Sequence, residues 1–183
     1  MFERYTEKAR RVVFYARYEA SQFGTPYIEV DQLLLALLRE DKPLFDRLLN
    51  GGATERQALD QELRALRTPG MKSSTSVDLP LSHSAKRVLA YGAEEAERLG
   101  HKHIDSVHLL LAVMREPSLA IDVLSRHDLE LEKLRSYLVA NASEIATHAT
   151  GSAAALSTLQ QQFRPLTIRL TSQIEPAPIF RLP

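Results

Sequence analysis

A segment of this 183-residue chain occurs twice, and the repetition restricts the possible folds more than any other feature. Residues 5–40 align without a gap with residues 81–116, at an offset of 76 positions. Of the 36 aligned residues, 14 are identical. Each copy of a repeat forms one supersecondary unit that buries its apolar face against a neighbouring unit. The sequence therefore predicts two similar units in tandem.

Each copy opens with the pattern of an amphipathic helix. Small and aliphatic side chains recur every three or four positions across residues 9–23 and again across residues 85–99. Residues suited to N-capping precede these segments and residues suited to C-capping follow them, namely Thr6, Ser82, Gly24 and Gly100. A second segment, apolar on nearly all sides, comes next at Leu33–Leu38 and Leu109–Met114. A helix of that kind is expected at the centre of the core.

Two further helical patterns complete each copy. Pro43 is suited to start a third helix that Gly51 and Gly52 end, and Thr54 is suited to cap a fourth. The counterparts in the second copy are residues 118–127 and 130–143. We therefore predict an all-α fold, a pseudo-twofold tandem of two four-helix units with eight helices in total.

Composition shifts mark the expected boundaries. Repeat 1 is assigned to residues 1–66 and repeat 2 to residues 81–147, and the Pro-, Gly- and Ser-containing residues 67–80 form a linker between them. Four of the chain's nine prolines lie in residues 148–183. This tail is predicted to be loosely structured or docked in an extended form, on its own domain or in a partner's groove.

Charge and residue usage exclude several classes of function. Lys plus Arg and Asp plus Glu both number 23, so the chain lacks the positive excess of nucleic-acid binders and polybasic membrane-surface proteins. There is no cysteine, which removes disulfides, thiolate metal sites and cysteine nucleophiles. The start of the chain does not resemble a secretory signal, and the longest aliphatic run is the six residues Leu33–Leu38. We predict a cytoplasmic protein without a membrane or nucleic-acid partner.

The repeated motifs resemble a known family. Residues 2–12 read FERYTEKARRV, and the two copies end in LLLALLRE and LLLAVMRE after a shared glycine and isoleucine. Given twice at this spacing, the pattern is similar to the Clp N-terminal domain, or Clp R domain, and most similar to its ClpC-type version. The resemblance covers roughly residues 2–143 and implies the eight-helix pseudo-twofold fold.

The resemblance also implies a function. In that family the domain precedes AAA+ ATPase modules and captures substrates and adaptor proteins for unfolding and delivery to the ClpP peptidase. This sequence contains no G-x-x-x-x-G-K-[ST] phosphate loop, so we expect a free-standing, non-catalytic protein-interaction module without cofactor or metal. The expected partners are proteins: a Clp unfoldase, ClpP, adaptors or substrates.

ClpC-type domains carry a site for phosphorylated arginine, and the resemblance places its residues in this chain. A carboxylate near the start of the second helix holds the guanidinium, and a hydroxyl and amides at the start of the first helix hold the phosphate. The matching positions are Thr6, Asp31 and Gln32 in repeat 1 and Ser82 and His108 in repeat 2. Asp31 stands where the family has Glu and Gln32 where it has His, while Val107 replaces the second carboxylate. The same residues are also suited to simple helix capping.

Two other interpretations are compatible with the sequence. The first is a helical-bundle metal protein or enzyme, because Asp105 and His108 share one helical face and His101 and His103 lie nearby. Repeat 1 has Glu29 and Gln32 at the equivalent positions, which leaves that ligand set incomplete. The second is a structural module that associates with itself through an apolar groove.

Overall fold

The computed structural model describes residues 2–67, 70–71 and 79–141, and these contain eight helices and no strand. The all-α tandem fold is therefore confirmed. Repeat 1 contributes α1 (Glu7–Phe23), α2 (Val30–Glu40), α3 (Lys42–Leu48) and α4 (Gly52–Ala65), and repeat 2 contributes α5 (His83–Arg98), α6 (Ser106–Arg115), α7 (Leu119–Arg126) and α8 (Leu131–Ala140). The predicted tail at 148–183 lies outside the described residues, and its docking stays a prediction.

The predicted caps hold the first helix of each repeat in place. The Thr6 hydroxyl accepts a hydrogen bond from the amide of Ala9 at 3.2 Å, and the Ser82 hydroxyl accepts one from the amide of Ala85 at 3.1 Å. At the end of α1, Gly24 has a φ of +66°, a left-handed conformation that favours glycine.

The start of α4 differs from the prediction. Thr54 was expected to cap this helix, but the N-cap position lies three residues earlier, at Gly51. Gly52 has a φ of +54°, and this conformation lets the chain turn into the helix directly after the short α3. Thr54 therefore lies inside the first turn and makes no cap.

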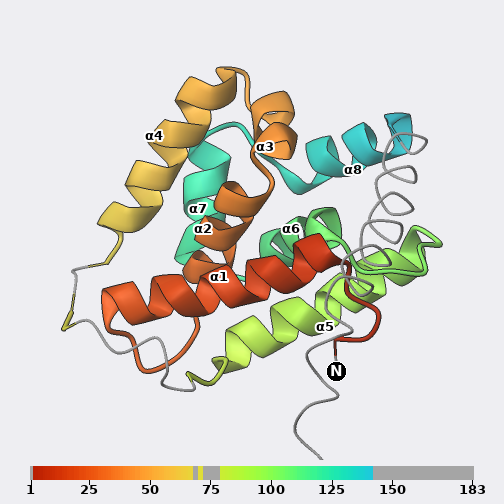
Figure 1. Ribbon diagram of the computed structural model, residues 1–183. Helices are drawn as coiled ribbons and strands as arrows, with labels where there is room; N and C mark the ends of the chain where they lie inside the picture. The colour runs from red at the N-terminus through yellow and green to blue at the C-terminus, as the bar shows by residue number, and fades with distance from the viewer. Residues whose placement is uncertain (1, 68–69, 72–78, 142–183) are drawn as a thin grey trace, which may run out of the picture. The chain divides into compact units, whose positions relative to one another are not determined.

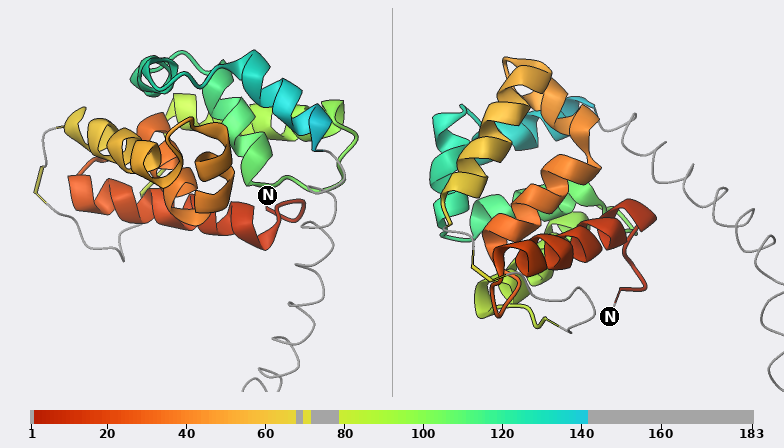
Figure 2. Two further views of the ribbon diagram at one scale, coloured as in Figure 1. Left: turned by 90° about the horizontal axis from the view of Figure 1, so that it is seen from above. Right: turned by 60° about the vertical axis from the view of Figure 1, so that its left-hand side comes forward.

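The two aliphatic helices occupy the centre, as predicted. Figures 1 and 2 show the long helices α1 and α5 on one side, the shorter α3, α4, α7 and α8 on the other, and α2 and α6 between them. Leu33–Leu38 and Leu109–Met114 are buried along their whole length, and α2 also packs against α6. Complete burial of a helix on all sides explains why its sequence lacks a polar face.

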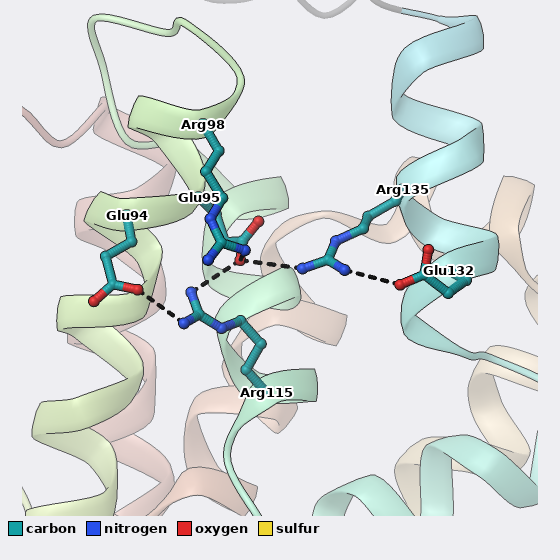
Figure 3. Close-up of polar contacts among 6 residues, drawn as sticks. All are labelled: Glu94, Glu95, Arg98, Arg115, Glu132 and Arg135. Atoms are coloured by element: carbon teal, nitrogen blue, oxygen red, sulfur yellow. Dashed lines mark hydrogen bonds and ion pairs between the residues drawn. The ribbon is translucent and has the colours of Figure 1, made fainter.

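Several of the identical polar residues join the helices of each repeat. The side chain of Glu95 is only 3% exposed, and it contacts Arg115 of α6 at 2.9 Å, Arg98 at 3.4 Å and Arg135 of α8 at 3.5 Å (Figure 3). In repeat 1 the equivalent Glu19 contacts Arg64 of α4 at 2.8 Å. A buried carboxylate thus links the first and fourth helices in both repeats.

Short extended segments of the two repeats pair with each other through backbone hydrogen bonds. Thr6 donates its amide to the carbonyl of Ile104 at 2.9 Å, and Ile104 donates its own to Arg4 at 2.7 Å. The symmetric pair connects Ser82 to Ile28 at 3.0 Å and Ile28 to Pro80 at 2.8 Å. Each first helix therefore starts beside the second helix of the other repeat.

None of the helices within residues 2–67, 70–71 and 79–141 combines the length and the apolar character that crossing a bilayer requires.

Candidate functional site

The pairing of extended segments places two equivalent pockets at helix N-termini, and residues of both repeats line each pocket. The first, here called the Asp31 pocket, has a volume of about 300 Å³ and is lined by Glu29, Val30, Asp31, Leu66, Arg67, Ser84, Ser118, Leu119 and Ala120. The second, the Val107 pocket, has a volume of about 290 Å³ and is lined by Lys8, Asp41, Pro43, Leu44, Arg47, Asp105, Ser106, Val107, Tyr137 and Asn141. The starts of α2 and α5 meet at the first pocket, and the starts of α6 and α1 at the second.

Asp31 and Arg67 form the main polar contact of the Asp31 pocket. Arg67 donates from Nε to Oδ2 at 2.6 Å and from Nη2 to Oδ1 at 2.9 Å, so both carboxylate oxygens accept from one guanidinium. Asp31 is 8% exposed and lies in the first turn of α2, where a negative charge is favoured by the helix dipole. Hydrogen bonding to this carboxylate raises the pKa of Arg67 above its ordinary value.

Two hydroxyl groups also line the Asp31 pocket, beside the carboxylate of Glu29 and the apolar side chains of Val30, Leu66, Leu119 and Ala120. Ser84 lies in the first turn of α5, and Ser118 is the N-cap residue of α7. The Ser118 hydroxyl is buried and has no hydrogen-bond partner among the described residues. A carboxylate, hydroxyls and the amide ends of helices therefore face one volume, a combination suited to a ligand that is both a cation and an anion.

The Val107 pocket has a different polar interior. The Thr6 hydroxyl donates to Asp105 at 2.8 Å across the repeats. A second buried carboxylate is that of Asp41 at the end of α2, which accepts from Lys8 at 3.2 Å and from the Ser106 hydroxyl at 2.5 Å. Val107, at the position equivalent to Asp31, is buried and offers no acceptor.

Gln32 and His108 do not line either pocket. Gln32 accepts from the amide of Glu29 at 2.8 Å and donates to the Thr25 hydroxyl at 2.9 Å. His108 accepts at Nδ1 from the amide of Asp105 at 2.8 Å, and its Nε2 lies 2.8 Å from Nδ1 of His101. Both side chains therefore cap the second helix of their repeat.

Burial changes the acid–base behaviour of His108. The side chain is 1% exposed, and the loss of solvation, followed by the neighbouring His101, lowers its pKa from 6.5 to about 4. His108 is consequently neutral near pH 7, the state that its acceptor role at Nδ1 requires.

The structure corrects the expected grouping of the site residues. The resemblance placed Thr6 with Asp31 and Ser82 with His108 inside single repeats, but the extended segments bring Thr6 to the start of α6 and Ser82 to the start of α2. Arg67 and Asp41 are pocket residues that the sequence argument missed. Arg67 stood in the assigned linker, and its adjacency to Asp31 depends on contacts across 36 residues of sequence.

The metal-site interpretation gains no geometric support. Asp105 and His108 face each other within a capping box rather than a shared coordination point. Among the described residues, no group of three or more histidine, aspartate or glutamate side chains is arranged to hold a metal ion.

These features define a class of protein: an all-helical tandem-repeat domain with a composite polar pocket at each junction between its repeats. The family comparison agrees, since the description "Clp repeat (R) N-terminal domain" matches residues 4–127 and 80–166. The chain belongs to this family, whose members are protein-interaction domains of Clp chaperones.

Similar proteins include Clp protease ATP-binding subunits and Clp chaperones. The chain is 34% identical over 140 residues to an ATP-dependent Clp protease ATP-binding subunit ClpA homolog of Guillardia theta, covering 76% of this chain and 17% of that protein. It is 32% identical over 153 residues to the chloroplastic chaperone protein ClpC of Pisum sativum, covering 83% and 16%. The chain thus spans about a sixth of the length of these relatives.

Solved structures support the fold. The N-terminal domain of the ClpD chaperone from Arabidopsis thaliana superposes with a TM-score of 0.62 at 22% identity, covering 78% of this chain and 97% of that one. The Hsp104 N-terminal domain from Candida albicans superposes with a TM-score of 0.60 at 16% identity, covering 73% and 88%.

Proposed function

We propose that this chain is a non-catalytic protein-interaction module that binds substrates, adaptors or other components of a Clp unfoldase system in the cytoplasm. The supporting observation is the pair of composite pockets, which present polar groups to a ligand on a rigid helical frame. In this proposal the partner proteins are a Clp unfoldase, ClpP, adaptors or substrates.

The Asp31 pocket is proposed to bind a phosphorylated arginine side chain. The Asp31 carboxylate pairs with the guanidinium of the ligand, as it already does with that of Arg67. The start of α5, with the Ser82 cap and the neighbouring Ser84, faces the same pocket and supplies a helix N-terminus for the phosphoryl group. Gln32 contributes indirectly, by capping the helix that carries Asp31.

The Val107 pocket is proposed to lack this activity. Thr6 and His108 occupy the equivalent positions, but Val107 provides no partner for a guanidinium. Two described side chains of that pocket, Asp41 and Asp105, carry buried carboxylates. Asp41 is already paired with Lys8, and Asp105 accepts from the Thr6 hydroxyl.

Titration calorimetry with free phosphoarginine tests the proposal. Wild type is expected to bind at one site, and Asp31→Ala is expected to abolish the heat of binding. Asp122→Ala is the matched control, because Asp122 is also a first-turn aspartate, in α7, but is exposed and lines neither pocket. Equal binding by wild type and Asp31→Ala would exclude this site.

A gain-of-function variant provides the second arm. Val107→Glu is expected to add a second binding site, since it restores a carboxylate at the start of α6. If neither wild type nor Val107→Glu binds phosphoarginine, the phosphoarginine proposal fails for both pockets.

A further inference from the structure

The carboxylate of the Asp31 pocket is already occupied by a group of the same chain. The two hydrogen bonds from Arg67, at 2.6 and 2.9 Å, use both oxygens of Asp31 in the side-on geometry of an arginine–carboxylate pair. Another guanidinium cannot form the same pair while Arg67 is in place. The Arg67 side chain is 35% exposed, so it can leave the carboxylate toward solvent without repacking the core.

Arg67 is held at the pocket by the segment that follows it. Gly70 donates its amide to the carbonyl of Phe23 at 3.0 Å, and the backbone of Met71 lies close against Gly24. A Cβ atom on Gly24 would lie 2.3 Å from the Met71 carbonyl oxygen, so this close approach requires glycine there. The start of the linker is therefore fixed to the end of α1, three residues beyond Arg67.

We propose that Arg67 is a built-in ligand of the Asp31 pocket, which an arginine-bearing segment of a partner protein must displace in order to bind. This inference rests on the proposed function, because it assigns the regulation of the same site. The ligand class is a guanidinium side chain presented by another protein, and the linker acts as an internal competitor for it.

The second repeat supports this assignment. It lacks the carboxylate, since Val107 replaces Asp31, and it also lacks the arginine, because the sequence contains none between Arg135 and Arg164. The α4 helix and its counterpart α8 end at Ala65 and Ala140, so that arginine-free stretch includes the position equivalent to Arg67. The carboxylate at the start of the second helix and the arginine after the fourth helix thus occur together in repeat 1 and are both missing from the equivalent positions of repeat 2.

With internal competition, the apparent affinity equals the intrinsic affinity multiplied by the fraction of molecules in which the pocket is open. A bidentate pair with a partly exposed arginine that is closed about nine-tenths of the time weakens an external ligand about 10-fold. Arg67→Ala removes the competitor and is expected to bind guanidinium ligands about 10-fold more tightly than wild type. Arg67→Lys, which keeps the charge but loses the two-pronged geometry, is expected to fall between them.

The experiment measures the binding of two probes, N-acetyl-arginine amide and phosphoarginine, by NMR titration of the full chain. The variants are wild type, Arg67→Ala, Arg67→Lys and Asp31→Asn/Arg67→Ala, and thermal melts show that each is folded. Arg56→Ala is the matched control. Arg56 lies in α4, the helix before the linker, and it also pairs with an aspartate, Asp46, at 2.7 Å. It does not line the Asp31 pocket. The Nε–H signal of Arg67 reports directly on its pairing with Asp31.

The expected result is tighter binding of both probes to Arg67→Ala, no change with Arg56→Ala, and loss of the gain when Asp31→Asn is added. Equal affinity of wild type and Arg67→Ala for both probes overturns the internal-ligand proposal, even where phosphoarginine binds well. Absence of binding by every variant overturns it as well. If Arg67→Ala gains affinity for the arginine probe but phosphoarginine binds no better than that probe, the internal ligand stands and the phosphoarginine proposal fails.

Discussion

Positions 31 and 107 occupy the same place at the start of the second helix of each repeat, yet they have opposite chemistry. Asp31 accepts two hydrogen bonds from Arg67, whereas Val107 is a buried apolar side chain. In the Val107 pocket the carboxylate that pairs with a cation comes instead from Asp41, ten residues further along repeat 1, and its cation is Lys8. Both pockets therefore contain a carboxylate neutralised by the chain's own cation, but from different positions.

The identical positions of the two repeats serve a different purpose. Glu19 and Glu95 are buried and paired with arginines, and Arg39 and Arg115 lie 4.2 Å from the ring centres of Tyr15 and Tyr91. These residues join helices within a repeat, so a change at any of them affects packing.

The largest expected effect tests whether the two cores are equivalent. Leu34 and Leu110 are both fully buried on the central helices, so Leu34→Ala and Leu110→Ala are each expected to lower the free energy of unfolding by about 2–5 kcal/mol. Urea denaturation measures both values. A loss in one repeat below about 1 kcal/mol would show that its central helix is not fully packed.

The next effect separates the two buried glutamates. Glu95 contacts three arginines within 3.5 Å, so Glu95→Gln is expected to cost about 2–4 kcal/mol by leaving these cations without their shared charge. Glu19→Gln is expected to cost less, about 1–2 kcal/mol, because Arg64 is 41% exposed and Arg39 lies 4.0 Å away. Denaturant titration of both variants gives the order, and a larger cost for Glu19→Gln would contradict it.

A third prediction uses the different caps of the second helices. The pKa of His108 is about 4 in the folded protein, against 6.5 when unfolded, so the unfolded state binds the proton first as the pH falls. The contribution of His108 to the free energy of unfolding should therefore be constant above about pH 7 and decrease between about pH 6.5 and 4. The contribution of this group amounts to about 3 kcal/mol at pH 4.

The matching residue of repeat 1 supplies the control for this effect. Gln32 makes the same cap without titrating, so His108→Gln should remove that part of the acid sensitivity. His103→Gln, at an exposed histidine of the same loop, should leave it unchanged. Identical pH profiles for wild type and His108→Gln would show that His108 is not the responsible group.

The fold was predictable because its signals are local or repeated. Helix periodicity, the Thr6 and Ser82 caps and the left-handed Gly24 are all visible within a few residues of sequence. The start of α4 was not, since Gly52 rather than a hydroxyl residue sets it. A glycine at a turn indicates conformational freedom but leaves open where the helix begins.

The candidate site was predictable only in its parts. The positions Thr6, Asp31 and Ser82 were identified, but their grouping depends on the pairing of extended segments between the repeats. That pairing consists of backbone hydrogen bonds, which nearly any residue can make, so the side-chain pattern does not predict it. Arg67 was missed for a related reason, as a long side chain in a linker can reach many positions.

The smallest expected effect concerns the arginine that ends each second helix. In repeat 1, Arg39 lies 5.2 Å from the ring centre of Tyr18, whereas in repeat 2 the residue equivalent to Tyr18 is Glu94, which pairs with Arg115 at 2.8 Å (Figure 3). Double-mutant cycles should give a coupling of about 0.5 kcal/mol in both cases. The two couplings should differ in salt, because an exposed ion pair is screened at 1 M salt and a cation–ring contact is affected much less. Equal salt sensitivity would show that Tyr18 does not replace Glu94 as the partner of the arginine.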